Sequence, residues 1–439
     1  MFTYHLRLAI KSLRRNPVLS GLMIAAIALG VGVCSTTLTV YRLMSANPIE
    51  RRNDVLYAVT LDNWGPQEPW SEKRPELAPM EVTHVDATAL AASDIPTRHV
   101  VMRKTSFVAD PSRISGTKPF LVESRLTTKD FFAMFNVPFR YGGGWNQAAD
   151  DGAQSVVVLS SKTNQKAFGG GDSVGKILQL DGRDYKVIGV LDEWNPSPKY
   201  YDLNNGAFDE PEDLFLPFSI GEILELPPAG NVNCWRNQPL NSYQDMMNSD
   251  CVWHQMWVEL PTREKVDAYQ AHMDNYVREQ KTLGRFERPL NNHLYRPDAW
   301  LELNRVVGND NRVLVGLAFM FLAVCLLNML GLLLAKFLGA APLVGLRRAL
   351  GASRSMIFRQ HLIEVALIGL AGGLLGVLLT ALGLLQVRTM YENYDGLTRL
   401  DFTMVLTALA IAIASGLVAG LYPTWRVCRT QPATYLKTQ

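Results

Sequence analysis

The amino-acid sequence predicts an α-helical membrane protein with four transmembrane helices and a large α+β extracytoplasmic domain inserted between helices 1 and 2. Three observations predict this fold class: four long apolar runs, basic residues at their borders, and a long segment of mixed polarity between the first two runs. The 43 basic and 41 acidic residues leave a net charge of +2. That balance gives no argument for a nucleic-acid partner, and we expect none.

Each apolar run is long enough to cross a bilayer, because an α-helix spans about 30 Å of hydrocarbon with about 20 residues. A buried core helix is also apolar throughout, but four runs with charged borders favour spans. The first run exceeds the apolar region of a signal peptide and lacks an A-x-A cleavage site, so we interpret it as a retained anchor. The predicted spans are residues 18–42, 312–338, 360–387 and 402–425.

Basic residues beside the spans predict the orientation, because cytoplasmic segments carry the excess of Lys and Arg. Arg14 and Arg15 precede the first span, and Arg426 follows the fourth. Arg347 and Arg348 lie between the second and third spans. Both termini are therefore expected in the cytoplasm. The cytoplasmic segments are 1–17, 339–359 and 426–439, and the outer segments are 43–311 and the short loop 388–401, which holds the acidic stretch 391–398.

The first 17 residues have the pattern of an amphipathic helix. Phe2, Leu6, Ile10 and Leu13 share one face, and basic residues lie elsewhere. Such a helix is expected to lie in the cytoplasmic interface of the membrane. The pair Asn16-Pro17 ends it before the first span, because a residue that precedes proline disfavours the helical conformation.

Two cysteines, Cys234 and Cys251, are alone in the outer segment. An oxidising compartment favours a disulfide between them, which closes a loop of about 17 residues and contributes on the order of 3 kcal/mol. The spacing Cys251-x-x-His254 also suggests a metal, but a fourth ligand is missing. We predict the disulfide and no metal site.

The segment 43–311 is expected to form a mixed α+β domain with two subdomains. Alternating apolar residues predict strands over 55–61, 100–108, 120–122, 155–160, 177–180, 185–190 and 252–260. The pair Asp181-Gly182 predicts a hairpin turn. Helices are predicted over 82–92, 127–135 with Thr127 as the N-cap, 162–168 and 264–283.

The stretch FGGGDSVGKI, residues 168–177, matches both the phosphate-loop spacing G-x-x-x-x-G-K and the hydrolase spacing G-x-S-x-G. Both motifs need a strand before them and a helix after them. Here a predicted helix precedes the glycines and a predicted hairpin follows, and Ile177 occupies the position of the metal-binding hydroxyl. We therefore expect a tight turn rather than an ATP site or a serine nucleophile.

Four stretches carry a resemblance to a known family. VVVLSSKTNQKAFGGGDSVGKILQLDGRDYKVIGVLDEW, residues 156–194, resembles the extracytoplasmic domain of MacB-type permeases. GLRRALGASRSMIFRQHLIEVALIGLAGGLLG, residues 345–376, resembles the most characteristic stretch of the FtsX/MacB permease superfamily. The ending AGLYPTWRVCRTQPATYL, residues 419–436, resembles the usual close of the fourth span, and LAIKSLRRNP, residues 8–17, the N-terminal helix.

The resemblance implies the permease subunit of a type VII ABC transporter in the bacterial inner membrane, without a fused ATPase domain and with its large domain in the periplasm. Two separate ATPase subunits would bind ATP and magnesium, so this chain would bind no cofactor and would not be an enzyme. Such permeases transmit ATP-driven motion to the periplasmic domain and power efflux, with membrane lipids around them and, in some systems, an adaptor and an outer-membrane channel. Relatives instead activate a cell-wall hydrolase or release lipoproteins, and these alternatives stay open. A membrane-anchored surface enzyme is disfavoured by four spans.

The resemblance also implies where the ATPase would dock. The segment between spans two and three is short, basic and helix-prone, with Leu346, Ala349 and Leu350 on one face. It suits a helix that plugs into an ATPase groove. The expected coupling residues are Gly345, Leu346, Arg347, Arg348, Ala349, Leu350, Gly351 and Ala352.

One departure from the family concerns the start of this segment. The family usually has Glu-Ile-Gly before the two basic residues, whereas this chain has Leu343-Val344-Gly345 after Pro342. A homodimer would lose that carboxylate twice. The departure favours a heterodimer with a second permease that retains it, and a homodimer that tolerates the loss is the alternative.

Two further features of the spans bear on packing. Pairs of glycines four residues apart allow close helix contact, within the chain or between two permeases, unless they face lipid. They are Gly369 with Gly373, Gly372 with Gly376, and Gly416 with Gly420. Glu364 is costly in hydrocarbon unless paired. We expect it to lie at the interface beside Arg359 and His361, with no charged partner from another span.

Overall fold

The structure, a computed structural model, describes residues 2–112, 116–390 and 402–429. The chain divides into two compact units. The helical unit comprises residues 1–45 and 307–439, and the α+β unit is the single continuous segment Ala46–Val306. The α+β unit thus lies within the predicted segment 43–311. The acidic loop 391–398 and the tail from residue 430 lie outside the described residues.

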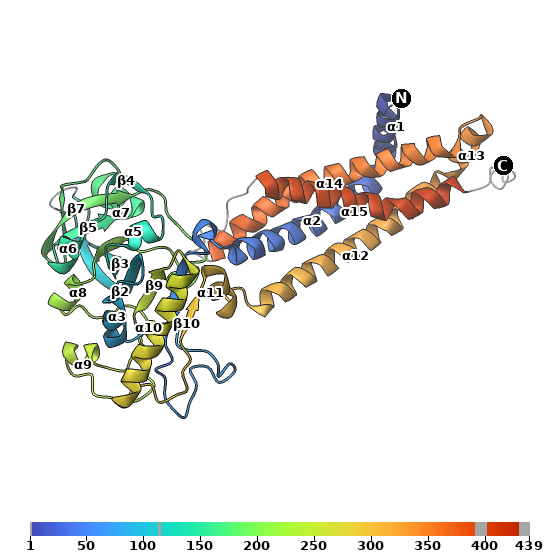
Figure 1. The fold of residues 1–439 in the computed structure, drawn as a ribbon. Helices are drawn as coiled ribbons and strands as arrows, with labels where there is room; N and C mark the ends of the chain where they lie inside the picture. The colour runs from blue at the N-terminus through green and yellow to red at the C-terminus, as the bar shows by residue number, and fades with distance from the viewer. Residues whose placement is uncertain (1, 113–115, 391–401, 430–439) are drawn as a thin grey trace. The chain divides into compact units, whose positions relative to one another are not determined.

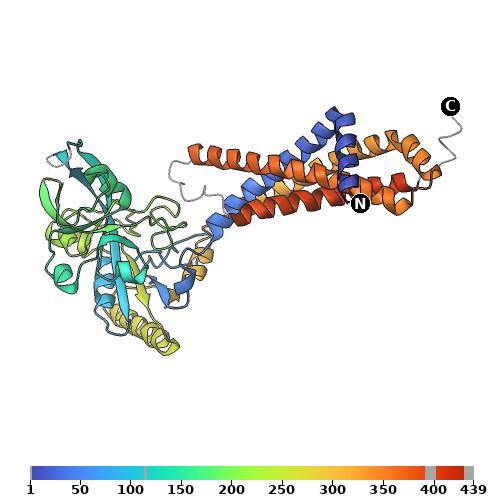
Figure 2. The same cartoon turned by 90° about the horizontal axis from the view of Figure 1, so that it is seen from above.

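The helical unit contains four helices that are long and apolar enough to cross a membrane. The first helix ends at Arg15, just before the predicted break at Asn16-Pro17, and Figures 1 and 2 show it running across the spans rather than along them. The third span is part of a helix that begins at Arg354, earlier than the predicted 360. The helices are α1 Phe2–Arg15, α2 Pro17–Ser45, α12 Asn309–Gly339, α13 Ala341–Ala349, α14 Arg354–Met390 and α15 Phe402–Cys428.

The spans pack around one apolar core. Helix α14 contacts α2 and α15, α12 contacts α2 and α15, and α1 contacts α14. The buried side chains of this core come from every span and include Met23, Ile27, Met329, Leu333 and Val365. Because a membrane supplies no hydrophobic drive between helices, close packing and polar contacts must hold the bundle together.

The α+β unit is built on one mixed sheet. Its helices are α3 His84–Ala91, α5 Phe131–Met134, α6 Gln147–Asp151, α7 Ser161–Phe168, α8 Ile220–Ile223, α9 Tyr243–Met247, α10 Arg263–Thr282 and α11 Pro297–Leu303. Its strands are β1 Leu56–Thr60, β2 Arg98–Asp110, β3 Phe120–Thr127, β4 Phe139–Gly142, β5 Val156–Leu159, β6 Ile177–Leu180, β7 Arg183–Leu191, β8 Leu214–Pro217, β9 Gln255–Glu259 and β10 His293–Tyr295.

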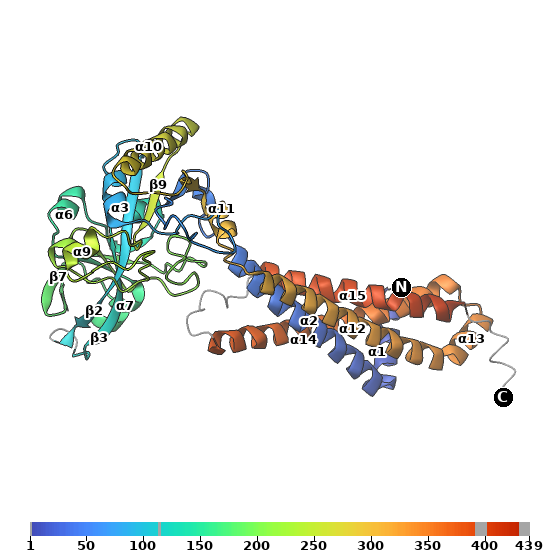
Figure 3. The ribbon, with the colours of Figure 1, turned by 90° about the horizontal axis from the view of Figure 1, so that it is seen from below.

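The ten described strands run in the order β10-β1-β9-β2-β3-β8-β5-β7-β4, and β6 pairs with β2 and β7. The longest pairing joins β2 and β3, which lie side by side in Figure 3. One sheet runs through the whole unit and carries a core on each face. Along β1, Leu56 and Ala58 enter one core, and Val59 enters the other. This alternation is what a strand buried on both faces produces.

The hairpin at Asp181-Gly182 forms between β6 and β7, with both residues at positive φ, 48° and 78°. The predicted helix 127–135 is wrong in extent. Thr127 belongs to β3, where it pairs with Met102, and only Phe131–Met134 is helical. Sheet pairing satisfies the backbone at Thr127, so its side chain caps no helix.

Candidate functional site

The segment between the second and third spans forms a short helix with two different faces. Helix α13 starts with a proline in its first turn, and Gly351 follows it at φ 97°, a left-handed conformation that ends helices. Leu343, Leu346 and Leu350 are exposed by 40%, 49% and 80%. Three apolar side chains on one side of α13 and its C-cap are therefore left half-exposed or more fully exposed, Leu350 most of all.

The opposite face of α13 holds it against the bundle. Ala341, Val344 and Gly345 are buried. Arg347 donates through Nη1 to Oε1 of Gln360 on α14 at 3.0 Å. The short helix is therefore a fixed projection of the bundle.

The structure places the expected coupling residues in two groups. Leu346, Ala349, Leu350 and Gly351 are exposed, and Arg347 and Arg348 are half-buried. Gly345 is buried and Ala352 packs against the helical core, so these two position the helix. Sequence reasoning missed Leu343, although its spacing of three from Leu346 and seven from Leu350 fits one helical face.

A buried polar cluster lies next to α13. Lys336 of α12 pairs through Nζ with Oε1 of Glu364 on α14 at 2.6 Å. Ser12 of α1 donates to the same oxygen at 2.7 Å, and Lys336 donates to the hydroxyl of Ser20 on α2 at 3.2 Å. His361 Nδ1 lies 3.5 Å from Oε2 of Glu364. The cluster therefore joins four helices of the unit at one carboxylate.

This cluster corrects the expectation that Glu364 has no charged partner from another span. Lys336 lies near the end of the second span, and its side chain is only 2% exposed. The sequence held a signal, because an ionisable residue inside a predicted span indicates that a partner is needed. The pairing itself depends on how α12 and α14 lie against each other.

The six glycines occupy helix contacts inside the chain. A Cβ at Gly372 would lie 2.7 Å from Cβ of Ile27 on α2, and Gly376 faces the same helix. Gly369 and Gly373 face α15, where Gly416 approaches Gly369 and a Cβ at Gly420 would lie 2.5 Å from Val365 Cγ1. Helix α14 therefore packs between α2 and α15 through two glycine faces, and none of the six faces outward.

Replacing Gly372 with valine is expected to destabilise the bundle by about 1–3 kcal/mol, because the new side chain overlaps Ile27 in a packed contact. The matched control is Gly331→Val on α12, where a Cβ would meet nothing within 4 Å. Both changes carry the same cost in helix propensity, so their difference reports packing. Thermal unfolding of the purified chain in detergent micelles measures it, and equal shifts would contradict the assignment.

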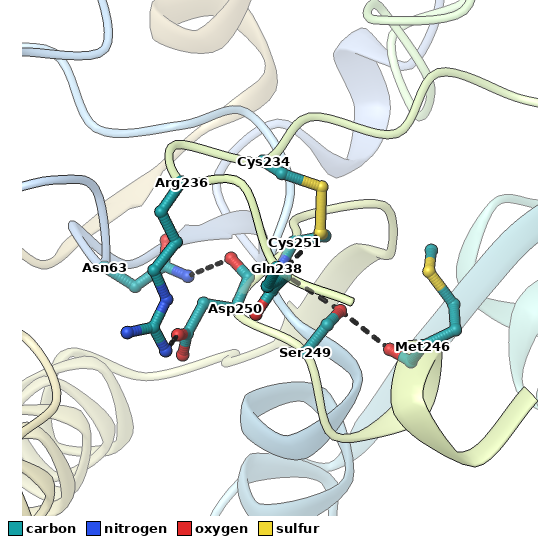
Figure 4. The surroundings of a disulfide bond; sticks show 8 residues. All are labelled: Asn63, Cys234, Arg236, Gln238, Met246, Ser249, Asp250 and Cys251. Atoms are coloured by element: carbon teal, nitrogen blue, oxygen red, sulfur yellow. Dashed lines mark hydrogen bonds and ion pairs between the residues drawn. A yellow bond between two sulfur atoms is a disulfide. The ribbon is translucent and has the colours of Figure 1, made fainter. Parts of the chain in front are cut away.

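In the α+β unit, Cys234 and Cys251 form a disulfide (Figure 4). Cys251 is buried, and Arg236 and Asp250 pair beside it. Because Cys251 is bonded to sulfur, it offers no thiolate to a metal with His254. The bridge constrains a loop of 17 residues, worth about 3 kcal/mol.

The glycine stretch 168–177 is a turn between a helix and a hairpin, as predicted. Helix α7 ends at Phe168, Gly169 and Gly175 have φ of 79° and 87°, and β6 begins at Ile177. Ser173 is fully buried, and its hydroxyl donates to Oδ1 of Asn164 at 2.6 Å. The serine is thus a structural residue of the turn.

The α+β unit also buries a network of charges. Arg125 on β3 donates through Nη1 to Oε1 of Gln255 at 3.0 Å and pairs through Nη2 with Asp202 and Glu212. Lys199 Nζ lies 3.5 Å from Oε1 of Glu212. The charged side chains of these pairs are completely buried. The network therefore fixes the loops before β8 to the middle of the sheet.

Two carboxyl groups of this network have shifted pKa values. Burial opposes ionisation of Glu212, but Arg125 and Lys199 outweigh it and lower the pKa of this carboxyl. Glu81 joins the network by accepting a hydrogen bond from Gln255 at 2.5 Å, and burial, together with nearby Asp202, raises its pKa well above its usual range.

Comparison with known families gives two matches that together cover most of the chain. Residues 20–276 match the family model described as the MacB-like periplasmic core domain. Residues 315–432 match the model described as the FtsX-like permease C-terminal domain. The second match includes α13, the polar cluster residue Glu364 and all six glycines.

Individual relatives are distant. The chain is 24% identical over 314 residues to the pyoverdine export ATP-binding/permease protein PvdT of Pseudomonas syringae pv. syringae, covering 70% of this chain and 42% of PvdT. It is 22% identical over 319 residues to the uncharacterized ABC transporter permease YvrN of Bacillus subtilis, covering 70% of this chain and 68% of YvrN. The chain thus spans less than half the length of PvdT.

Among solved structures, the periplasmic region of MacB from Actinobacillus actinomycetemcomitans is similar with a TM-score of 0.37 and 11% identity, covering 59% of this chain and 98% of that one. The family models carry the assignment, because the first covers more than half of the chain. The chain belongs to the family of the MacB-like periplasmic core domain and is an ABC transporter permease of the MacB/FtsX type.

Proposed function

We propose that this chain transmits ATP-driven motion from separate ATPase subunits to its α+β unit and so powers export from the periplasm or the outer leaflet. Two ATPase subunits bind ATP and magnesium, and this chain binds neither. The α+β unit lies in the periplasm, and both termini lie in the cytoplasm of a bacterium. The basic residues beside the spans support this orientation.

The observation that carries the proposal is the exposed apolar row of α13. Leu343, Leu346 and Leu350 point outward from a helix whose other face is anchored by Val344 and the Arg347–Gln360 hydrogen bond. An apolar row that projects from a fixed helix suits insertion into a groove of a partner. The polar cluster and the glycine contacts then pass a displacement of α13 to the other helices.

A separate ATPase is supported by the two family matches, which both describe permease domains. It is also supported by YvrN, a relative whose name is that of a permease alone and of which the chain covers 68%. The purified chain should therefore hydrolyse no ATP by itself.

The partner permease is proposed to be a different chain. Leu343 stands where the resemblance implies a glutamate, and its side chain is exposed on α13. A heterodimer with a permease that keeps the carboxylate restores that contact on one side. A periplasmic adaptor and an outer-membrane channel complete the proposed export path.

Site-specific cross-linking tests the coupling role. A photo-cross-linking residue at Leu346 in the full chain, expressed in its own host membrane, is expected to capture an ATP-binding subunit. The matched control places the same residue at Leu283 of the α+β unit, which is 70% exposed and is expected to capture none. The variant Leu346→Glu with Leu350→Glu should then lose ATPase association by at least about tenfold, because two charges enter an apolar contact.

The outcomes separate the candidate functions. Capture of an ATPase from Leu346, with an adaptor in the purified complex, supports export. Capture of an ATPase together with a cell-wall hydrolase would favour the signalling function over export. If the residue at position 346 captured no ATPase, α13 would have no coupling role.

A further inference from the structure

The helical unit contains a pocket of about 810 Å³ that the coupling role does not explain. It lies between α1, the start of α2, the end of α12, α13 and the start of α14. Figures 1 and 3 show these elements together at the same end of the bundle. The pocket therefore sits where the apolar spans end and basic residues begin.

The pocket walls carry unbalanced positive charge. Lys11 and Arg15 of α1 and Arg347 of α13 line it, together with Lys336. Lys336 is neutralised by Glu364. Across the described ranges 2–112, 116–390 and 402–429, no carboxylate pairs with Lys11, Arg15 or Arg347, and no acidic residue lines the pocket. Three cations thus line one cavity, which favours an anionic ligand.

The rest of the lining is largely apolar. Leu8, Leu19, Phe337, Val344 and Ile357 contribute to the walls. A small hydrated anion gains nothing from such side chains, whereas a ligand with a charged head and a hydrocarbon body satisfies both kinds of wall. The level of the pocket, at the ends of the spans, is also the level of lipid headgroups.

We propose that this pocket binds the headgroup of an anionic phospholipid. Lys11 and Arg15 hold the phosphate from α1, Arg347 holds it from α13, and the first part of the acyl chains lies against Leu19 and Phe337. The bound lipid links the N-terminal helix to the helix that bears the exposed leucine row. The inference goes beyond the proposed function and does not rest on it, because the purified chain alone should bind the lipid.

Native mass spectrometry of the full chain in neutral detergent tests the site with phosphatidylglycerol and phosphatidylcholine at equal concentrations. The wild type is expected to retain phosphatidylglycerol in preference. The variant Lys11→Gln with Arg15→Gln should lower its occupancy at least about tenfold. The matched control, Arg7→Gln with Arg14→Gln, removes two exposed charges from the same helix outside the pocket and should change occupancy less than about twofold.

The charge-keeping variant Lys11→Arg with Arg15→Lys should retain the lipid, which separates loss of charge from loss of folding. If both double glutamine variants lost the same amount of bound phosphatidylglycerol, the lipid would be held by general attraction to a basic helix, and the proposed site would be wrong. Equal retention of the two lipids would also overturn it. Displacement by millimolar inorganic phosphate would assign a free anion instead. Loss of ATPase capture in Lys11→Gln with Arg15→Gln, with lipid retention unchanged, would make the pocket part of the ATPase contact.

Discussion

Replacing Lys336 with methionine is expected to destabilise the helical unit by about 3–5 kcal/mol, because it leaves the carboxylate of Glu364 buried without its cation. Glu364 is completely buried, and Lys336 provides its 2.6 Å ion pair. The loss should also loosen α1, since Ser12 is held by the same oxygen. Unfolding of the purified chain in mixed micelles measures the first effect, and protease cleavage near residue 16 measures the second.

A double-mutant cycle provides the control. Glu364→Gln removes the charge and keeps an acceptor for Ser12, so the double variant Lys336→Met with Glu364→Gln should recover a large part of the loss. A favourable coupling between the two positions is therefore expected. Additive losses would show that Lys336 and Glu364 act independently and would contradict the ion pair.

Replacing Arg125 with methionine is expected to destabilise the α+β unit by a similar amount, about 3–5 kcal/mol at neutral pH. The change leaves Asp202 and Glu212 without the cation that pairs with both. Trp257, buried in the core of this unit, gives a fluorescence signal for its unfolding in the full chain. The control Arg183→Met removes an exposed arginine from β7 and should change stability little.

The pH dependence of the Arg125 variant follows from Glu212. In the wild type the pKa of Glu212 is lowered, so its contribution is present above about pH 4 and is lost as the pH falls. Without Arg125, the largest charge that offsets burial is gone, and we expect the pKa of Glu212 to rise above that of the unfolded chain. Its contribution is then present at low pH and is lost as the pH rises. The loss of unfolding free energy in the variant, relative to the wild type, should therefore become smaller as the pH falls. A loss that becomes larger as the pH falls would contradict this role of Arg125.

Several features could be predicted from the sequence because they depend on local chemistry. The break at Asn16-Pro17, the turn at Asp181-Gly182 and the glycine turn before Ile177 follow from allowed backbone conformations. The strands β4, β8 and β10 escaped prediction, although the equally short β5 and β6 were found, because their own residues show no clear alternation and they form only by pairing with strands elsewhere in the chain.

In the candidate site too, some features could be predicted from local sequence and others depend on contacts between distant residues. The apolar spacing of Leu346 and Leu350 predicts an outward face, and the structure adds Leu343 to it. The contacts of the glycines could not be assigned from spacing. Gly372 contacts α2 and Gly373 contacts α15, although each belongs to a pair with the same spacing of four residues. Only the packing of the helices shows which neighbouring helix each glycine contacts.

The sequence by itself predicted four long apolar helices, a folded α+β segment between the first two, and the short helix between the second and third, because hydrophobic length and residue conformation are properties of neighbouring residues. Tertiary structure alone decided that Lys336 meets Glu364, that one sheet carries two cores, and that Lys11, Arg15 and Arg347 surround one pocket. These are contacts between residues far apart in the chain, and their energies depend on distance and burial that no local pattern contains.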